Sequence, residues 1–361
     1  MGDIPKNVAL IYDRVNKWGG AEKVLLALHE IFPDAPLYTS VYHSQSAPWA
    51  KVFPKIIPSF LQGFPLAQSH HELYAWATPI AFETLDLGGY DAVVSVTSSD
   101  AKAVITGPTT FHLCYCLTPT RYLYSHPVVP WPISSYLKRW DRIASRRPDS
   151  YIAISGVVQD RIKQYYGQDS QIVYPPVDLE IFKDTKYMIR DTKYFLAVNR
   201  LVYHKQPEVL VEVFNELNLP LTMIGSGHMY SRLVQMAKPN ISILNHVTDA
   251  ELVSHYKAAL AYVSVHEEDF GIAYVEAQAA GLPILALNRG GVRDIVTHGQ
   301  TGLLLDSIDE LKSAIINFSS YKFNSQLAIS NSRVFSKARF QSEFAKVFKA
   351  EWEKYKSTST S

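Results

Sequence analysis

Two glutamates, Glu268 and Glu276, stand on either side of Phe270 and Gly271 in the segment HEEDFGIAYVE. An apolar segment, AYVSV (261–265), precedes them, and a helical pattern follows. A glycine at the start of a helix leaves unpaired backbone N–H groups and the positive end of the helix dipole facing a phosphate. Carboxylates nearby can accept hydrogen bonds from hydroxyl groups. The segment therefore fits a diphosphate with a sugar at each end, although the spacing alone also suits a strand-to-helix connection with solvent-facing acids.

Two basic residues, Arg200 and Lys205, follow another apolar segment of strand length, residues 194–198. A fixed guanidinium and a mobile ammonium at the end of a strand could neutralise a diphosphate. The alternative is a solvated pair at the entrance of a helix. We favour phosphate binding because open α/β sheets bind ligands beyond the carboxyl ends of their strands.

Glycines occur in three further loops that border predicted strands or helices. Gly225 and Gly227 follow the apolar segment 221–225, Gly290 and Gly291 follow 284–287, and WGG ends the loop before a helix that begins near residue 21. Each loop could let a ligand approach the backbone, or could simply turn the chain. In the WGG loop, the amides of the two glycines could face a phosphate or a sugar.

Apolar segments of strand length alternate with helical patterns through the whole chain, which predicts parallel sheets built from βα units. The predicted strands are residues 8–12, 92–96, 111–116, 151–154, 194–198, 221–225, 241–245, 261–265, 284–287 and 302–305. The predicted helices include residues 21–32, 156–167 and 207–217, and a capping box of Thr248 and Glu251 opens another. The fold class is therefore α/β, with two Rossmann-like domains, residues 1–183 and 184–340, joined by the charged linker 183–193.

Composition narrows the function further. The 361 residues suffice for two domains, and 35 basic against 34 acidic residues give a net charge of +1. That balance provides no overall field for nucleic acid, so we expect no nucleic-acid partner and only a local phosphate site. Cys114 and Cys116 suit neither a zinc site nor a disulfide framework, and we expect buried reduced thiols and a cytoplasmic protein. The sequence starts without a secretion signal and has no apolar run of membrane-spanning length.

The segment 121–149 mixes aromatic residues with a cluster of basic ones, Lys138, Arg139, Arg142, Arg146 and Arg147. This composition suits the anionic surface of a membrane or a phosphate-linked acceptor. It equally suits a helix whose aromatic side packs while its charged side is solvated. Peripheral contact at the inner face of the cell membrane is therefore left open.

Five segments resemble the GT4 family of retaining glycosyltransferases with the GT-B fold. They are WGGAEK (18–23), VNRLVYHK (198–205), MIGSG (223–227), HEEDFGIAYVEAQAAGLPIL (266–285) and GGVRDIV (290–296). Residues 19–42 are also similar to a bacterial subgroup that includes mannosyltransferases of polysaccharide and lipopolysaccharide assembly. The resemblance implies that the C-terminal helix, residues 341–361, packs back on the first domain.

The resemblance also implies roles for single residues at the donor. Arg200 and Lys205 match the pair that holds the donor diphosphate, Glu268 matches the acid that binds donor-sugar hydroxyls, and Glu276 matches the acid that binds the ribose. The resemblance implies further donor contacts from the backbone of Phe270, Gly271 and Ile272 and from the glycine loops at Gly19, Gly20 and Gly225. It also implies that Arg200, Lys205 and Glu268 are the catalytic residues. Because these motifs are of the metal-independent type, we expect no cofactor and no metal, despite the acidic pair Glu267 and Asp269.

One position departs from the family pattern. Leu117 stands where many members place a histidine that contacts the donor sugar. Either the substrate phosphate and backbone amides suffice here, or another residue, such as His112, Thr118 or Arg121, reaches the site. A milder departure is at Ser155, for which a helix cap is the favoured interpretation.

The resulting expectation is a retaining, metal-independent hexosyltransferase with chemistry in a cleft between its domains. It would move a hexose from a nucleotide diphosphate sugar, of the GDP-mannose or UDP-glucose type, to a saccharide or a polyprenyl- or other lipid-linked acceptor in cell-surface polysaccharide assembly. The alternatives are an epimerase or phosphorylase of the same fold and a sugar-nucleotide-binding protein without turnover. An NAD-dependent oxidoreductase is disfavoured because the first βα turn lacks a full Gly-x-Gly-x-x-Gly pattern.

Overall fold

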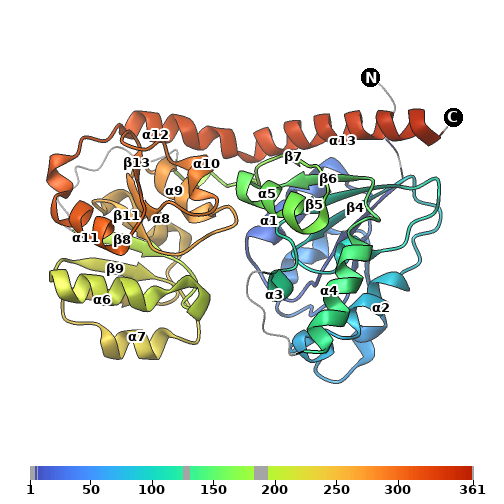
Figure 1. Cartoon of the computed structure of the whole chain (residues 1–361), viewed down its shortest axis with the longest axis horizontal. Coiled ribbons are helices and arrows are strands. Elements are labelled where there is room, and N and C mark those ends of the chain that lie inside the picture. The colour runs from blue at the N-terminus through green and yellow to red at the C-terminus, as the bar shows by residue number, and fades with distance from the viewer. Residues whose placement is uncertain (1–4, 6, 125–130, 183–193, 360–361) are drawn as a thin grey trace. The chain divides into compact units, whose positions relative to one another are not determined.

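The computed structural model divides the chain into two compact units, shown in Figure 1. Unit 1 comprises Met1–Pro176 and Phe340–Ser361, and unit 2 comprises Val177–Arg339. The structure describes residues 5, 7–124, 131–182 and 194–359. The predicted linker at 183–193 lies outside the described residues.

A parallel seven-stranded sheet forms the centre of unit 1, with the strand order β3-β2-β1-β4-β5-β6-β7. Its strands are β1 (Val8–Tyr12), β2 (Leu37–Thr39), β3 (Ile56–Pro58), β4 (Ala92–Thr97), β5 (Phe111–Cys116), β6 (Ser150–Ala153) and β7 (Gln171–Ile172). Strands β1, β4 and β5 are buried along their whole length, as expected for parallel strands covered on both faces. Within β5, Cys114 and Cys116 are buried free thiols, as predicted.

Helices flank the sheet of unit 1, and one of them, α5, has clear signals at both ends. They are α1 (Gly20–Ile31), α2 (Thr78–Glu83), α3 (Arg121–Tyr124), α4 (Ile133–Ala144) and α5 (Gly156–Tyr166), followed at the end of the chain by α13 (Lys337–Ser359). The hydroxyl of Ser155 caps α5 by accepting from the backbone N–H of Val158, and Gly167 ends the helix in the left-handed conformation. Ser155 is thus a helix cap.

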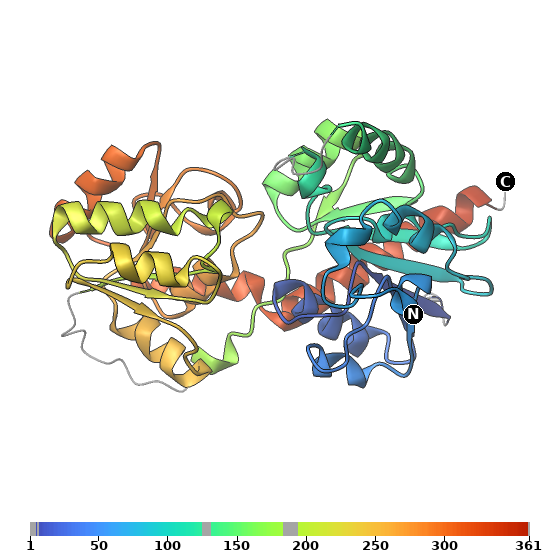
Figure 2. The ribbon, with the colours of Figure 1, turned by 90° about the horizontal axis from the view of Figure 1, so that it is seen from below.

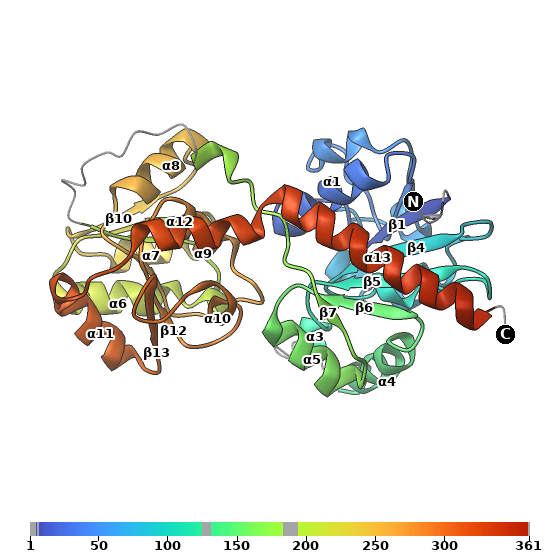
Figure 3. The same ribbon diagram turned by 90° about the horizontal axis from the view of Figure 1, so that it is seen from above.

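The C-terminal helix α13 packs on the sheet of unit 1 through aromatic residues one helical turn apart (Figure 3). Phe340, Phe344 and Phe348 are fully buried. The Phe348 ring lies 5.8 Å from that of Phe111, and the Phe340 ring lies 5.8 Å from that of Tyr115, centroid to centroid. Spacing of four residues places these side chains on one face of the helix, which explains why the end of the chain belongs to unit 1.

Unit 2 contains a parallel six-stranded sheet with the order β10-β9-β8-β11-β12-β13. Its strands are β8 (Phe195–Val198), β9 (Leu221–Ile224), β10 (Ile241–Leu244), β11 (Tyr262–Ser264), β12 (Ile284–Leu287) and β13 (Gly302–Leu305). Its helices are α6 (Pro207–Leu217), α7 (Tyr230–Met236), α8 (Asp249–Ala258), α9 (Ile272–Ala279), α10 (Val292–Ile295), α11 (Ile308–Ile316) and α12 (Ser325–Ser332). Figure 2 shows α6 (yellow-green) beside α7 (yellow) on this sheet. The predicted capping box forms, with Thr248 and Glu251 bonded in both directions.

The two α/β units confirm the predicted fold class, and each sheet has one point where its strand order reverses. In unit 1, β1 lies between β2 and β4, and in unit 2, β8 lies between β9 and β11. Open α/β sheets bind their ligands at such points, beyond the carboxyl ends of the strands. Among the described residues, no helix is both long and apolar enough to cross a membrane.

Candidate functional site

In unit 2, the loops that follow β8 and β11 meet at the reversal of the strand order. The loop after β8 carries Arg200 and continues into the 3-10 turn η6 (Tyr203–Lys205). The loop after β11 carries His266 and Glu268. Because β8 and β11 are paired neighbours, residues far apart in the sequence come together here.

Lys205 and Glu268 form an ion pair at this point, with 2.5 Å between Nζ and Oε2. The second oxygen of Glu268 lies 2.8 Å from Nε2 of His266. Burial alone would raise the pKa of the Glu268 carboxyl, but the hydrogen bond from His266 and the charge of Lys205 outweigh burial and hold this pKa well below its usual range. Glu268 is therefore an ionised acceptor whose two oxygens are held by a lysine and a histidine.

The two basic residues differ in burial and in their partners. Lys205, expected to be mobile, is buried and held by Glu268, whereas Arg200, expected to be fixed, is exposed. The sequence could not show this difference, because it depends on Glu268 reaching Lys205 from another loop. The exposed guanidinium can still reach a ligand at the carboxyl end of β8.

Helix α9 begins directly after this acidic loop. Gly271 precedes it with φ 101°, and a Cβ atom at Gly271 would lie 2.2 Å from a ring carbon of Tyr274. Only glycine fits this left-handed position against the tyrosine. The hydroxyl groups of Tyr274 and Ser264 lie 2.8 Å apart, and this hydrogen bond connects the first turn of α9 to the end of β11. The N–H of Tyr274 already donates to the carbonyl of Gly271 at 3.0 Å, whereas the N–H groups of Ile272 and Ala273, the first two helical residues, have no helical acceptor and can meet an anion.

Glu276 lies within α9 and is half-buried. It accepts a hydrogen bond from the hydroxyl of Tyr256, 2.9 Å from Oε2. Burial, followed by the charge of Glu276, raises the pKa of the Tyr256 phenol well above its usual value, so the phenol remains a donor. The phenol of Tyr256, on α8, therefore helps to position the carboxylate of Glu276.

The glycines after β9 and β12 allow loops to approach each other closely. A Cβ atom at Gly225 would lie 1.8 Å from the carbonyl oxygen of Asn199, and one at Gly290 would lie 2.2 Å from that of Glu268. The N–H of Gly225 already donates to the carbonyl of Leu244 at 3.0 Å. The absence of a side chain at Gly225 thus allows the loop that carries Arg200 to pack closely against it. The N–H of Gly225 is used in a hydrogen bond to the end of the neighbouring strand β10.

The glycine loop of unit 1 precedes α1, which begins at Gly20. Glu22, in the first turn, is buried and accepts a hydrogen bond of 2.6 Å from the hydroxyl of Tyr12. Gly19 adopts an extended conformation, and a Cβ atom there would lie 3.2 Å from the carboxylate of Glu22. Gly19 therefore leaves room for an acid that already occupies the start of α1.

The structure argues against one of the residues considered as substitutes at Leu117. His112 is wrong, because it is fully buried in β5 and bonded through Nε2 to Ser95 Oγ at 2.8 Å. Burial, together with the charge of Arg147, lowers the pKa of His112 to about 3, so it is a neutral core histidine. Thr118 is also buried, whereas Arg121 is half-buried.

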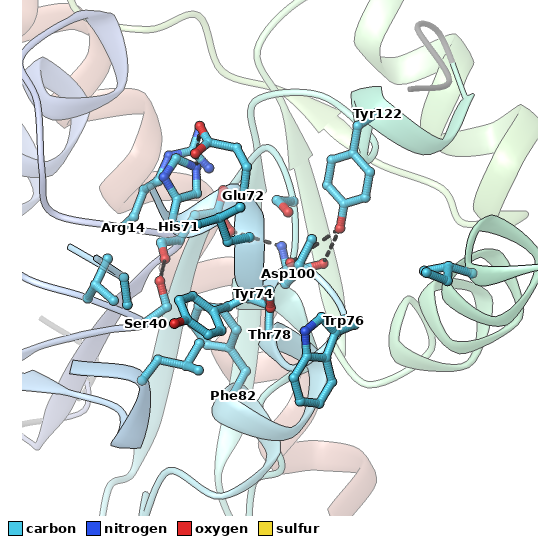
Figure 4. Close-up of a pocket in the computed structure, with 18 residues that line it drawn as sticks. Arg14, Ser40, His71, Glu72, Tyr74, Trp76, Thr78, Phe82, Asp100 and Tyr122 are labelled. Carbon is cyan, nitrogen blue, oxygen red and sulfur yellow. Dashed lines mark hydrogen bonds and ion pairs between the residues drawn. The ribbon is translucent and has the colours of Figure 1, made fainter. Parts of the chain in front are cut away.

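Unit 1 contains a cavity of about 500 Å³ that was not predicted from the sequence (Figure 4). Four of its polar residues follow three neighbouring strands: Arg14 follows β1, Ser40 follows β2, and Ser99 and Asp100 follow β4. The cavity thus lies where the strand order of unit 1 reverses. The only signal in the sequence was the polar residue directly after each strand.

Asp13 holds the floor of this cavity together. Its Oδ1 accepts from the hydroxyl of Thr97 at 2.8 Å and from the backbone N–H groups of Asp100 and Ala101 at 3.0 and 2.9 Å. Its Oδ2 accepts from the N–H of Ser98 at 2.7 Å. The carboxylate therefore ties the loop after β4 to the end of β1.

Asp100 faces the cavity and is itself buried. Its carboxyl accepts from the hydroxyl of Tyr122 at 3.2 Å, and Figure 4 shows this tyrosine directed at the acid. Burial raises the pKa of Asp100 to about 7, with the charge of Lys102 opposing the shift and that of Asp13 adding to it. The group can accept or donate a hydrogen bond near neutral pH.

Across residues 7–124, 131–182 and 194–359, no three His, Cys, Asp or Glu side chains converge as metal ligands would. The carboxylate of Glu268 is occupied by Lys205 and His266.

Comparison with protein families covers most of the chain. The family described as "Glycosyltransferase Family 4" matches residues 18–181, and "Glycosyl transferases group 1" matches residues 181–332. The two matches meet close to the boundary between the two units.

Curated relatives share a quarter to a third of their residues with the chain in the matched regions. A GDP-mannose-dependent alpha-(1-6)-phosphatidylinositol monomannoside mannosyltransferase of Mycobacterium tuberculosis is 25% identical over 45% of this chain and 50% of its own length. A D-inositol 3-phosphate glycosyltransferase of Thermobifida fusca is 30% identical over 45% of this chain and 44% of its own length. The chain spans about half the length of the curated relatives it matches.

Solved structures match nearly the whole chain. HepE of Anabaena, in complex with UDP-glucose, superposes with a TM-score of 0.70 at 18% identity, over 95% of this chain and 100% of its own. Sucrose-phosphate synthase of Thermosynechococcus elongatus gives a TM-score of 0.72 at 15% identity, over 95% of this chain and 98% of its own. At these identities the likeness establishes the shared fold.

Proposed function

Because this chain belongs to the GT4 family of glycosyltransferases with the GT-B fold, we propose that it transfers a hexose from a nucleotide diphosphate sugar to a hydroxyl group. The observation that carries the proposal is the cluster at the strand reversal of unit 2. There, Lys205 and Glu268 form an ion pair next to the glycine-started helix α9. A cation and a helix N-terminus suit the diphosphate, and an ionised carboxylate suits sugar hydroxyls.

The chemistry requires stabilisation of the departing nucleoside diphosphate. When the bond between the anomeric carbon and the phosphate oxygen breaks, negative charge develops on that oxygen. Donors that are already in place for this charge lower the barrier more than groups that contact only the ground state. Lys205 is buried and fixed, and Arg200 and the first-turn amides of α9 add donors to the same region. Glu276, on α9, is assigned to the ribose hydroxyls.

The donor is proposed to be of the GDP-mannose or UDP-glucose type. Relatives named for GDP-mannose and a structural neighbour in complex with UDP-glucose support both choices. Since Lys205, Arg200 and the helix N-terminus supply the positive charge, we further propose transfer without a metal. We also propose that the transfer retains the configuration at the anomeric carbon.

Helix α4 supports contact of this cytoplasmic enzyme with the inner face of the membrane, as part of cell-surface polysaccharide assembly. Ile133, Tyr136 and Ile143 are exposed on it, close to exposed Arg139 and Arg142. Apolar side chains flanked by arginines suit an anionic lipid surface.

The test combines nucleotide binding with product analysis. A thermal-shift series with UDP-, GDP- and ADP-sugars identifies the nucleotide, because a ligand well above its Kd raises the apparent stability. Incubation of the selected donor with saccharide and lipid-linked acceptors should then give a glycoside, and NMR of the product gives its anomeric configuration.

The alternatives give different outcomes in the same experiment. A new sugar from the donor alone would identify an epimerase, and a sugar phosphate formed with inorganic phosphate would identify a phosphorylase. Nucleotide binding without transfer to any acceptor would identify a binding protein. Loss of activity in EDTA that manganese restores would contradict transfer without a metal.

A further inference from the structure

The cavity of unit 1 combines a polar floor with an apolar mouth. The floor holds Asp100 and Arg14, which follow neighbouring strands. At the mouth, Leu73, Trp76 and Ile133 line the cavity and yet remain 60%, 54% and 45% exposed. Large apolar side chains around a pocket at this level of exposure indicate a ligand with an apolar part.

The floor is suited to hydroxyl groups. Asp100 accepts hydrogen bonds from the hydroxyl of Tyr122 at 3.2 Å and from the side chain of Ser99, and the two oxygens of a carboxylate can accept further bonds from a ligand in the cavity. The Nε of Arg14 is buried and has no hydrogen-bond partner among the described residues. A donor and an acceptor facing one cavity can bind adjacent hydroxyls of a sugar ring.

The charges of the floor argue against an anionic headgroup. Asp13 and Asp100 both line the cavity, and Arg14 is the one permanent cation in its lining. His71 is neutral at physiological pH, because burial and the charge of Arg14 lower its pKa to about 4. A phosphate placed on this floor would meet two buried carboxyls, whereas neutral hydroxyls can donate to them.

The apolar mouth continues onto the exposed face of α4. Ile133 lines the cavity and is also the first residue of α4, whose Tyr136 is 53% exposed one turn further on. The mouth therefore joins the surface that is proposed to contact lipid. A ligand that reaches the polar floor from that surface must first pass the apolar mouth.

We propose that this cavity binds a glycolipid acceptor, with a neutral glycosyl headgroup on Asp100 and Arg14 and the aliphatic chain against Leu73, Trp76 and Ile133. The acceptor role rests on the proposed function. Among acceptors, the cavity thereby selects a lipid-linked sugar over a free saccharide. Asp100 and Arg14 contact the headgroup, and the rim residues determine specificity for the chain.

The test measures binding of alkyl hexosides to the full-length chain. Octyl glycosides of glucose, galactose, mannose and N-acetylglucosamine, each below the concentration at which it forms micelles, are compared with the matching methyl glycosides by calorimetry or saturation-transfer NMR. At least one octyl glycoside should bind about tenfold or more tightly than its methyl counterpart, because the chain buries apolar surface at the rim. Equal affinity of every pair would overturn the proposal.

Three variants locate the binding. Leu73→Ser and Trp76→Ala should remove most of the advantage of the octyl over the methyl glycoside, whereas Asp100→Asn should weaken both ligands alike. Ile105→Ser is the matched control, because Ile105 is 53% exposed and does not line the cavity. An octyl advantage that survives both rim variants, or falls equally in the control, would place the binding elsewhere and contradict the proposal.

Nucleotide binding separates this proposal from the proposed function. Thermal shifts with UDP and GDP report on the site of unit 2 and should be unchanged in the rim variants. If nucleotide binds and no octyl glycoside is preferred, the glycolipid proposal fails and the transferase proposal stands. If octyl glycosides bind as expected and no nucleotide does, the transferase proposal fails and the binding assignment stands.

Discussion

The ammonium group of Lys205 lies 2.5 Å from a carboxylate oxygen of Glu268, and the two residues come from loops that follow neighbouring strands. The cation assigned to the diphosphate is therefore positioned by the acid assigned to the sugar. Both groups are largely removed from water, so the loss of one leaves the other as an unpaired charge. The site thus acts as a unit, which single substitutions can reveal.

Lys205→Ala should weaken the binding of UDP or GDP by about tenfold to a hundredfold, because Glu268 then presents an uncompensated negative charge to the diphosphate. Lys205→Ala/Glu268→Gln should bind nucleotide more tightly than Lys205→Ala alone. Isothermal titration with the nucleotide selected by the thermal-shift series checks the order. A double variant as weak as Lys205→Ala would show that the repulsion is negligible.

The exposed arginine supplies a second test of the same site. Arg200→Ala should reduce both nucleotide affinity and product formation, with a smaller effect on stability than Lys205→Ala because Arg200 is exposed. If Arg200→Ala/Lys205→Ala binds nucleotide and forms product at the wild-type level, the proposed function fails.

Gly271→Ala should abolish most nucleotide binding, because Gly271 has φ 101° and its Cβ would overlap the ring of Tyr274. Gly299→Ala is the matched control: Gly299 has φ 76° and nothing within 4 Å of a Cβ atom. The control carries the backbone strain of the left-handed conformation without the overlap, so it should cost about 1 kcal/mol of stability and leave nucleotide binding unchanged. Titration with nucleotide and urea denaturation of both variants separate the two effects, and equal nucleotide affinity in both would contradict the expected role of Gly271.

The bounds of several longer elements in both units could be predicted closely from the sequence. Strands β5 and β12 and helix α6 have the predicted bounds, because buried parallel strands are continuous apolar runs and Pro207 marks the start of its helix. Strands β2, β3 and β7 were missed, since two or three residues carry no detectable periodicity. Such short strands are fixed by their neighbours in the sheet.

The pairing of site residues could not be predicted in the same way. The sequence places Lys205 and Glu268 after strands β8 and β11, but two strands separate these in the chain, and only the sheet order makes them neighbours. The cavity of unit 1 was missed for the same reason, because Arg14, Ser40 and Asp100 follow three different strands. His112 could not be assigned from the sequence either. It lies on β5, the strand that precedes Leu117, but its side chain is bonded to Ser95 and belongs to the core.

Asp100→Asn should stabilise the protein at pH 8 and have less effect at pH 5. The carboxyl ionises near its usual pKa when unfolded but at about 7 in the native state, so the native state binds the proton more tightly. The stability of the wild type therefore falls as the pH rises between about 4 and 7, by up to about 4 kcal/mol, and the variant lacks this loss. Denaturation in urea at both pH values measures the difference. A stability difference independent of pH would show that Asp100 titrates normally.

The buried ion pair of Lys102 and Asp141, 2.6 Å long, should respond more strongly to single than to double substitution. Asp141 also accepts from Thr120 and Tyr124, so its lone pairs are satisfied. Lys102→Met should cost about 3–5 kcal/mol, because it leaves Asp141 as a buried unpaired charge, and Lys102→Met/Asp141→Leu should recover part of that loss. Chemical denaturation of the four proteins gives the coupling energy, and additive effects would argue against charge pairing as the cause.

The chain should sediment with vesicles that contain phosphatidylglycerol and remain in solution with pure phosphatidylcholine. Arg139→Gln/Arg142→Gln should reduce the binding by about tenfold or more, because each arginine near an anionic surface contributes about 1 kcal/mol. Arg232→Gln/Arg333→Gln is the matched control, since it removes the same charge from exposed positions of unit 2. Binding should also weaken as salt is added, because surface charges are screened. Failure to sediment with acidic vesicles at low and high salt alike, or an equal loss in the control, would contradict a membrane contact through α4.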